Sequence, residues 1–282
     1  MRALFLIPGN GVSQLQALPA VAATAQQLNF QIQVACGLDV SGVWKLLPEV
    51  EKVLPFSFSN ASLADWANLL GSVREPDFQA CVNLAGGRQV DLMLSMSHIP
   101  TRVAAAGFSA TERVTPSSDG WPDQALEAYL RPMGVSLDAN AFRLTLPAKA
   151  LAEATAALPS GDGPMLLLAP SGRDGDWPLQ QWQQLPGRIR SSLASLRFQE
   201  VSPASPSAEP LLARAALVAA CDVVLASDPL TVELALLCGV PVVALGREGS
   251  SLPVREGVKG LMAPGGLATL SIDVVLAALG LG

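Results

Sequence analysis

Short apolar runs alternate with longer amphipathic segments along the whole chain. The first half opens with an apolar run at 3–7, a glycine-containing turn at 9–11 and a segment of helical periodicity over 13–28. The same pattern predicts further strands at 31–35, 52–56 and 80–84, and helical segments at 43–47 and 62–72. Because buried strands that alternate with crossover helices form parallel sheets, this half predicts an α/β domain.

The alternation starts again after a weakly patterned stretch, 109–140, which contains one predicted helix at 123–130. Strands are then predicted at 165–169, 197–201, 223–226 and 242–245, and helices at 147–158, 179–193, 211–220 and 268–279. The chain therefore predicts two successive parallel-sheet domains, 1–145 and 146–282. Two such domains imply a cleft between them, which is a common place for a ligand.

The segment 223–246 reads as one complete strand–helix–strand unit. Asp228 is a typical helix N-cap, Pro229 suits the first helical position, and Gly239 supplies a stop. In such a unit the free N–H groups and the positive dipole end of the helix face outward at the carboxyl end of a parallel strand. The segment therefore predicts an anion-binding site.

Composition narrows the function classes. Half of the 282 residues are hydrophobic and the net charge is −6, which argues against disorder and against nucleic acid or anionic membrane as the primary partner. The first apolar run is too short for a secretory leader, so we expect a cytoplasmic protein. The four cysteines lack CxxC spacing and predict free thiols without a zinc site: Cys36, Cys81, Cys221 and Cys238.

The first candidate site is the turn after the first predicted strand. It has neither the GxGxxG pattern nor the GK[ST] of a P-loop, so dinucleotide and Walker-type binding are disfavoured. Two interpretations stay open. The turn is either a tight connection with Ser13 as helix N-cap, or a place where the backbone of Gly9, Asn10 and Gly11 approaches a ligand.

The second candidate is the turn 170–178. There Ser171 and the backbone of Gly172 are suitable donors to phosphate oxygens, and Arg173 is a natural bidentate partner for them. The alternative is a surface turn with Arg173 in water.

The third candidate is the helix entrance that holds Asp228, Thr231 and Glu233. A carboxylate at Glu233 could accept hydrogen bonds from two ribose hydroxyls, whereas the alternative is a solvated helix face. The only histidine, His98, lies in a stretch without a nucleophile elbow, which disfavours Ser-His-Asp catalysis.

Taken together, these motifs resemble family 9 of the glycosyltransferases, the heptosyltransferase-like enzymes of bacterial lipopolysaccharide assembly. The resemblance is carried by residues 15–21, 47–53, 129–134, 168–171, 177–182 and 227–245. It implies a GT-B fold of two Rossmann-like domains, with the acceptor on the N-terminal side and the nucleotide-sugar donor on the C-terminal side. It also implies hexosyl or heptosyl transfer from an ADP-linked donor to an envelope glycan or lipid-linked acceptor. Neither metal nor cofactor is implied, and membrane contact is at most peripheral.

The sequence departs from that family where its chemistry lies. The family's Gly-Asp, whose Asp is taken as the catalytic base, reads Val12-Ser13, and a serine hydroxyl is effectively unionised near neutral pH. If the base has moved, Asp39, Asp65 and Glu75 are the candidates.

The donor side departs as well. The family's lysine before Trp-Pro is Gly175, and its Asp-Ser/Thr-Gly-x-x-His reads 228–233. Leu230 replaces the glycine and narrows the backbone approach to phosphate, and Glu233 replaces the histidine. Three readings stay open: a divergent glycosyltransferase, a catalytically silent homologue that acts as a binding or scaffold protein, and another GT-B enzyme such as an epimerase.

Overall fold

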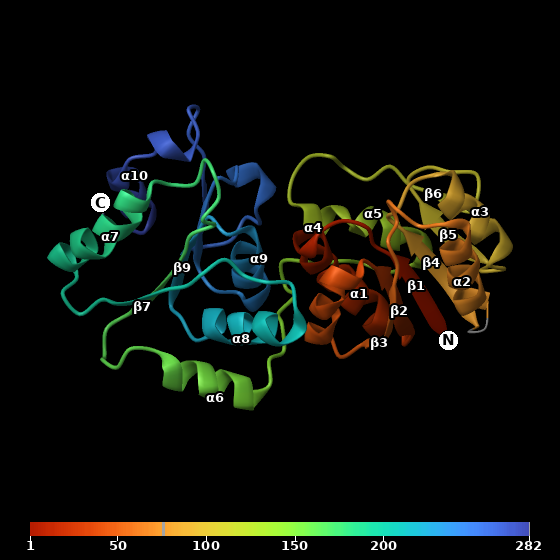
Figure 1. Cartoon of the computed structure of the whole chain (residues 1–282), viewed down its shortest axis with the longest axis horizontal. Coiled ribbons are helices and arrows are strands. Elements are labelled where there is room, and N and C mark those ends of the chain that lie inside the picture. Colours follow the sequence, from red (N-terminus) through yellow and green to blue (C-terminus); the bar gives the residue numbers. More distant parts are fainter. Residues whose placement is uncertain (75–76, 282) are drawn as a thin grey trace. The chain divides into compact units, whose positions relative to one another are not determined.

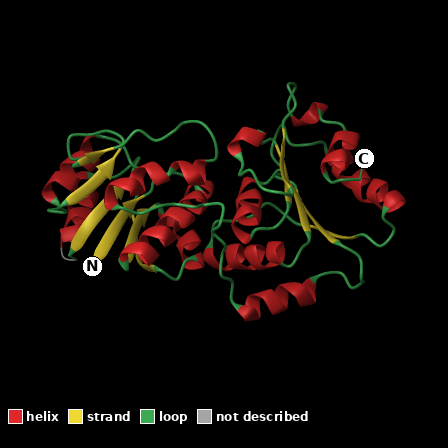
Figure 2. Cartoon of the chain, turned by 180° about the vertical axis from the view of Figure 1, so that it is seen from behind, coloured by secondary structure: helices red, strands yellow, loops and turns green. Residues whose placement is uncertain are grey.

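The computed structural model describes residues 1–74 and 77–281. The chain divides into two compact units. Unit 1 comprises Met1–Phe142 with Pro206–Ala208, and unit 2 comprises Arg143–Ser205 with Glu209–Gly282. In each unit the strands form a sheet beside which helices pack (Figures 1 and 2).

Unit 1 is built on a six-stranded sheet in the order β3-β2-β1-β4-β5-β6, in which every pairing is parallel. Its elements are β1 (Arg2–Leu6), α1 (Gly11–Leu28), β2 (Gln31–Cys36), η1 (Leu38–Leu46), β3 (Val50–Pro55), α2 (Leu63–Arg74), β4 (Phe78–Asn83), α3 (Arg88–Met96), β5 (Thr101–Ala104), β6 (Glu112–Arg113), α4 (Pro122–Ala125), α5 (Glu127–Leu130) and η2 (Arg131–Met133). The central strand β1 has β2 on one side and β4 on the other.

Unit 2 is built on a five-stranded parallel sheet in the order β11-β10-β9-β7-β8. Its elements are α6 (Ala148–Ala157), β7 (Met165–Ala169), α7 (Leu179–Ser192), β8 (Arg197–Glu200), α8 (Ala208–Ala219), β9 (Val223–Ala226), α9 (Pro229–Cys238), β10 (Val242–Leu245), η3 (Gly249–Ser251), β11 (Val258–Leu261), η4 (Leu267–Thr269) and α10 (Ile272–Ala278). Here β7 lies between β8 and β9.

Each sheet therefore has one point where the strand order reverses. In unit 1 this point lies between β1 and β4, because the chain passes from β1 to β2 on one side and from β4 to β5 on the other. In unit 2 it lies between β7 and β9, which lead to β8 and β10 in opposite directions. In open parallel sheets, ligands bind in the crevice outside the carboxyl ends of the strands at such a point. The strand order alone therefore predicts one ligand site in each unit, at the carboxyl ends of the strands beside the reversal point.

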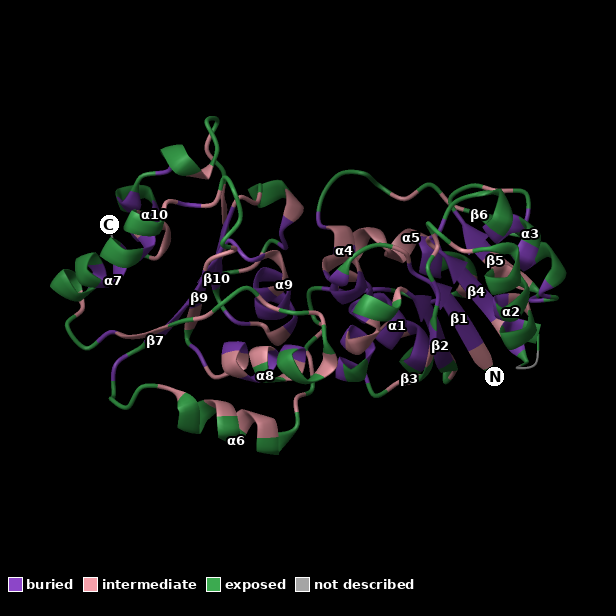
Figure 3. Cartoon of the chain, in the orientation of Figure 1, coloured by how far each residue is buried: buried purple, intermediate pink, exposed green. Residues whose placement is uncertain are grey.

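Continuous apolar runs became the central strands because both of their faces are covered. All five residues of β7 are buried, as are four of the five in β1 (Figure 3). The core of unit 2 includes the side chains of Trp177 and Trp182, whose rings meet edge to face at 5.1 Å. This is the composition expected of a parallel sheet with helices on its faces.

Several predicted elements need correction. The predicted helix 123–130 is two short helices, α4 and α5, and the predicted helix 268–279 is η4 followed by α10, because Ser271 caps a new helix by accepting the Val274 N–H. The segment 43–47 belongs to the 3-10 helix η1. Among the described residues, six elements were not predicted: α3, β5, β6, β11 and the 3-10 helices η2 and η3. In α3 the apolar residues do not mark a single face, since Asp91 is buried beside apolar residues while Leu92 and Met96 are exposed.

The four cysteines are free, as predicted, and burial raises the pKa of the Cys36 thiol to about 11. None of the helices in the described part of the chain combines the length and hydrophobicity that a bilayer crossing requires.

Candidate functional site

Two of the candidate segments from the sequence meet at the carboxyl ends of β7 and β9, where the strand order of unit 2 reverses. The turn 170–178 follows β7, and Ser227 and Asp228 follow β9, which pairs with β7 in parallel register. The backbone N–H of Ser171 donates to Ser227 Oγ at 2.9 Å, so the two connections are joined directly. We call the turn 170–178 together with Ser227 and Asp228 the strand-end cluster.

The entrance of α9 has the predicted cap. Asp228 is 3% exposed, and its Oδ2 accepts hydrogen bonds from the Thr231 N–H at 2.9 Å and the Thr231 hydroxyl at 2.5 Å. The Ala204 N–H adds a third donor at 3.3 Å. Pro229 occupies the first turn and Gly239 ends the helix in the left-handed conformation, both as predicted. The helix entrance is therefore closed on one side by the protein's own carboxylate.

Arg214 of α8 extends this network and was not singled out from the sequence. Its Nη1 donates to Thr231 Oγ1 at 2.9 Å and its Nη2 donates to the Ser202 carbonyl. Burial lowers the pKa of Arg214, and Asp228 opposes that shift. The available signal was a lone charge in the apolar run 211–219.

The turn after β7 is organised by Asp176, which sequence reasoning also missed. Asp176 accepts the Gly172 N–H at 2.9 Å and the Trp177 N–H at 2.7 Å. The N–H groups of Ser171 and Gly172, which we expected to bind phosphate, therefore have internal acceptors in this structure. Arg173 is exposed, and among the described residues it forms no ion pair. Phosphate binding by these three residues stays a prediction.

Burial alone would raise the pKa of the Asp176 carboxyl, but hydrogen bonds from Ser227, Ser171, Trp177 and Gly172 outweigh it and the pKa lies below its ordinary value. A depressed carboxyl pKa stabilises the fold above the unfolded-state pKa, and this contribution is lost as the pH falls through the folded-state pKa. We expect Asp176→Asn to cost about 1 kcal/mol at neutral pH. In thermal melts the gap from wild type should close below roughly pH 4. The exposed Asp174→Asn is the control, and an equal gap at every pH would contradict this role.

Glu233 is not on a solvated helix face, and that interpretation is wrong. The residue is 0% exposed, because α9 is buried continuously from Thr231 to Leu237. Its Oε1 accepts from Arg247 Nη1 at 2.8 Å, and the Arg247 side chain is 20% exposed. Arg247 follows β10 and also donates to Ser251 Oγ and to the Ser251 carbonyl. The ribose contact predicted for Glu233 stays a prediction.

In unit 1, the turn after β1 has the expected tight geometry but a different cap. Asn10 caps α1 by accepting the Ser13 N–H at 3.2 Å, so Ser13 is not the N-cap and the helix begins at Gly11. Gly9 has φ +100°, and a Cβ there would lie 2.8 Å from Ser13 Oγ. Both conditions require glycine at this position.

The side chain of Gln14, which is 0% exposed, is hydrogen-bonded to the backbone of the same turn. Its Nε2 donates to the carbonyls of Ile7 at 3.0 Å and Pro8 at 3.3 Å, and its Oε1 accepts from Trp44 Nε1 at 3.0 Å. The signal in the sequence was the helical spacing of Gln14 with the apolar Leu18 and Val21, which places it on the buried face of the helix. Gln14 therefore fixes the backbone that the sequence predicts to approach a ligand.

We expect Gln14→Leu to lower the free energy of unfolding by about 2–4 kcal/mol, because it leaves the Trp44 indole N–H and the Ile7 carbonyl buried without these partners. The exposed Gln26→Leu on the same helix should stay within about 0.5 kcal/mol of wild type. Urea denaturation measures the free energy of unfolding of both variants. Equal losses would contradict the role of Gln14 in fixing the turn.

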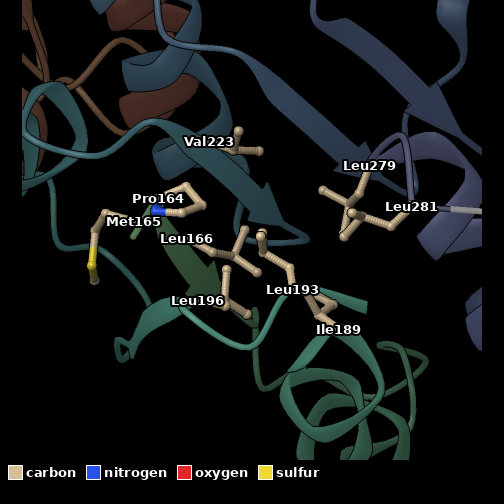
Figure 4. Close-up of a pocket in the computed structure, with 9 residues that line it drawn as sticks. All are labelled: Pro164, Met165, Leu166, Ile189, Leu193, Leu196, Val223, Leu279 and Leu281. Atoms are coloured by element: carbon tan, nitrogen blue, oxygen red, sulfur yellow. The ribbon is translucent and has the colours of Figure 1, made fainter. Parts of the chain in front are cut away.

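A cavity of about 210 Å³ in unit 2 lies away from the strand-end cluster. Pro164, Met165 and Val223, at the amino ends of β7 and β9, line it together with apolar side chains of α7 and the C-terminal segment (Figure 4). It belongs to the opposite edge of the sheet. Within 1–74 and 77–281, no three His, Cys, Asp or Glu side chains are grouped closely enough to hold a metal ion.

No protein-family model and no curated protein matches the sequence. Solved structures do match. The glycosyl transferase family 9 protein from Veillonella parvula DSM 2008 is 13% identical with a TM-score of 0.76, over 99% of this chain and 96% of that one. Escherichia coli ADP-heptose lipopolysaccharide heptosyltransferase II is 16% identical with a TM-score of 0.73, over 99% and 98%.

E. coli heptosyltransferase WaaC, solved with ADP-2-deoxy-2-fluoro heptose, is 15% identical with a TM-score of 0.69, over 99% of both chains. At this identity the matches establish the fold. They confirm that the chain has the α/β architecture of GT-B glycosyltransferases, which the resemblance in sequence implied.

Proposed function

We propose that this protein is a glycosyltransferase that moves a sugar from a nucleotide-sugar donor to a glycan or lipid-linked acceptor without a metal ion. One observation carries the proposal: a fold shared with heptosyltransferases over 99% of the chain. The similar enzyme E. coli heptosyltransferase WaaC has been solved with ADP and with ADP-2-deoxy-2-fluoro heptose, and this favours an ADP-linked donor here. The reaction would serve lipopolysaccharide or envelope polysaccharide synthesis on the cytoplasmic side of a bacterial membrane.

The donor is assigned to the strand-end cluster of unit 2. Arg173 is exposed beside the connection after β7, where a guanidinium can pair with the oxygens of a diphosphate. A fixed cation of this kind offsets the charge that develops on the leaving diphosphate, which is the role a metal would otherwise have. Because Glu233 is buried against Arg247, we propose that it acts on the donor by orienting Arg247 rather than by touching the ribose.

The acceptor is assigned to unit 1, at the turn formed by Gly9, Asn10 and Gly11. Ser13 occupies the position of the family's base, and its hydroxyl lies 3.4 Å from Asn10 Oδ1. A serine there cannot take the proton that transfer releases, because it has no basic partner. Catalysis therefore needs a carboxylate from elsewhere.

Asp39 is the carboxylate we assign to that role. It is exposed and follows β2, whose carboxyl end lies beside that of β1 in parallel register. Asp65 is already used, since it accepts the N–H and hydroxyl of Ser62 at 2.8 and 2.7 Å and caps α2; these bonds lower its pKa. Glu75 lies outside the described residues.

The alternative is a silent homologue that binds its ligand without transferring a sugar. The absence of a carboxylate at positions 12 and 13 favours it. The two readings share the fold and the donor site, so nucleotide binding does not separate them. Sugar transfer by the wild-type protein does.

The test of donor binding is a thermal-shift series with ADP, UDP, GDP and ADP-linked sugars. A ligand that binds only the native state should add about 2.7 kcal/mol of stability at one hundred times its Kd. We expect a shift with an ADP ligand that Arg173→Ala reduces and the exposed Arg188→Ala on α7 leaves unchanged. No shift with any of these nucleotides would rule out the donor site.

A further inference from the structure

A second cavity lies in unit 1, on the side of the sheet where the carboxyl ends of the strands lie. It has a volume of about 300 Å³ and lies at the carboxyl ends of β4 and β5. Besides the segment 104–107, it is lined by Asn83, Gly86, Gly87, Arg88, Asp91 and Tyr129. The cavity lies one strand away from the point between β1 and β4 where the strand order reverses, and on the carboxyl-end side of the sheet, where open parallel sheets bind their ligands.

Two buried polar side chains line this cavity without an internal partner for their donor groups. Asn83 is 4% exposed and Tyr129 is 9% exposed. The Oδ1 of Asn83 accepts the Ala85 N–H at 3.0 Å, but within the described part of the chain neither Asn83 Nδ2 nor the Tyr129 hydroxyl forms a hydrogen bond. Neither donor atom is enclosed by protein: both side chains line the cavity, so their donor groups are open to it. A ligand in the cavity can accept hydrogen bonds from both.

The entrance of α3 adds further donors. Gly87 is its N-cap and provides no side-chain cap, and its φ of +117° requires glycine. The space above it is open, since a Cβ on Gly86 would meet nothing within 4 Å and one on Gly87 only Gln89 Oε1 at 3.9 Å. The N–H groups and the positive dipole end of a nine-residue helix therefore face accessible space, with the exposed Arg88 beside them.

The one carboxylate among the lining residues is occupied. Asp91 accepts the Ser109 hydroxyl at 2.6 Å and the N–H groups of Ser109 at 3.4 Å and Phe108 at 3.3 Å. Its lone pairs are thus directed to the connection after β5. The groups left for a ligand are hydrogen-bond donors: an amide NH₂, a phenol, backbone N–H groups and a guanidinium.

We propose that this cavity, the Asn83 pocket, binds a small molecule through an oxyanion, either a carboxylate or a phosphate. Asn83 Nδ2 and the Tyr129 hydroxyl donate to the oxyanion, and Arg88 with the start of α3 supplies the positive charge. The pocket lies in unit 1, whereas the proposed donor site lies in unit 2. The inference therefore stands whether or not the protein transfers sugar.

The test is isothermal titration calorimetry of the full-length protein with inorganic phosphate and, separately, with glucuronate. We expect saturable binding of at least one, and the better ligand identifies the oxyanion. Asn83→Asp keeps the acceptor for Ala85 N–H but replaces the donor by a negative charge, so binding should weaken more than tenfold. Tyr129→Phe should weaken it about three- to tenfold, the worth of one hydrogen bond.

Three comparisons decide the outcome. Tyr129→Phe should leave the melting temperature unchanged, because its hydroxyl has no partner in the fold; a lowered melting temperature would make the hydroxyl structural and overturn the pocket. Arg88→Ala should weaken binding while Lys45→Ala, an exposed charge on η1, should not. Binding of neither ligand, or binding that Arg173→Ala abolishes and Asn83→Asp leaves intact, also overturns the proposal.

Discussion

Replacing Arg247 by methionine should lower the free energy of unfolding by about 3–5 kcal/mol. The substitution leaves the Glu233 carboxylate, which is 0% exposed, without the guanidinium that contacts it at 2.8 Å. Removing one partner of a buried ion pair costs far more than the pair itself contributes, because the remaining carboxylate stays buried and loses the guanidinium. Urea denaturation followed by circular dichroism measures the change, and a loss below 1 kcal/mol would contradict it.

Two further variants isolate the cause. Arg188→Met removes an exposed ion pair of the same unit, with Asp273 at 2.6 Å, and should cost about 0–1 kcal/mol. Adding Glu233→Gln to Arg247→Met removes the stranded charge and should recover part of the stability. A double variant no more stable than Arg247→Met would mean that the arginine acts through packing rather than charge.

Replacing Asp39 by asparagine should reduce kcat by about 100- to 10,000-fold if Asp39 is the general base of sugar transfer. The nucleotide-induced thermal shift should not change, because the donor is assigned to other residues. The assay is transfer from an ADP-linked sugar to envelope glycan acceptors.

The matched control is Asp65→Asn, which weakens the two hydrogen bonds from Ser62 at the start of α2 and should lower stability while kcat stays normal. Full activity of Asp39→Asn would exclude Asp39 as the base. A wild-type protein that binds nucleotide but transfers no sugar to any acceptor would favour the silent homologue.

Local signals predicted the backbone around the strand-end cluster well. The strand Val223–Ala226, the cap at Asp228 and the left-handed Gly239 are all found where the sequence places them. Each depends on residues within one turn of one another: a β-branched run, a short polar side chain before Pro229, and a glycine that tolerates positive φ. Such features need no knowledge of the rest of the chain.

Features set by distant residues were not predictable in this way. A solvated helix face was one of the two readings of Glu233, because a carboxylate near a helix start is usually exposed, yet a partner fourteen positions later, Arg247, allows it to be buried. Gln14 is polar but inside, because Trp44 and the turn carbonyls satisfy it. Asn10 displaced Ser13 as the cap, since either side chain suits that place and only the path of the turn decides.

The Asp176 carboxylate has a consequence for how unit 2 would respond to a ligand. Its oxygens accept the N–H groups of Gly172 and Trp177, and the first of these is one that the proposed diphosphate would use. The carboxylate is therefore a built-in mimic of the proposed ligand. An incoming anion must displace that mimic, and its apparent affinity falls in proportion to the time the mimic is bound. We therefore expect the turn to discriminate by competition: a single weak anion leaves it closed, whereas a diphosphate that engages several donors at once opens it.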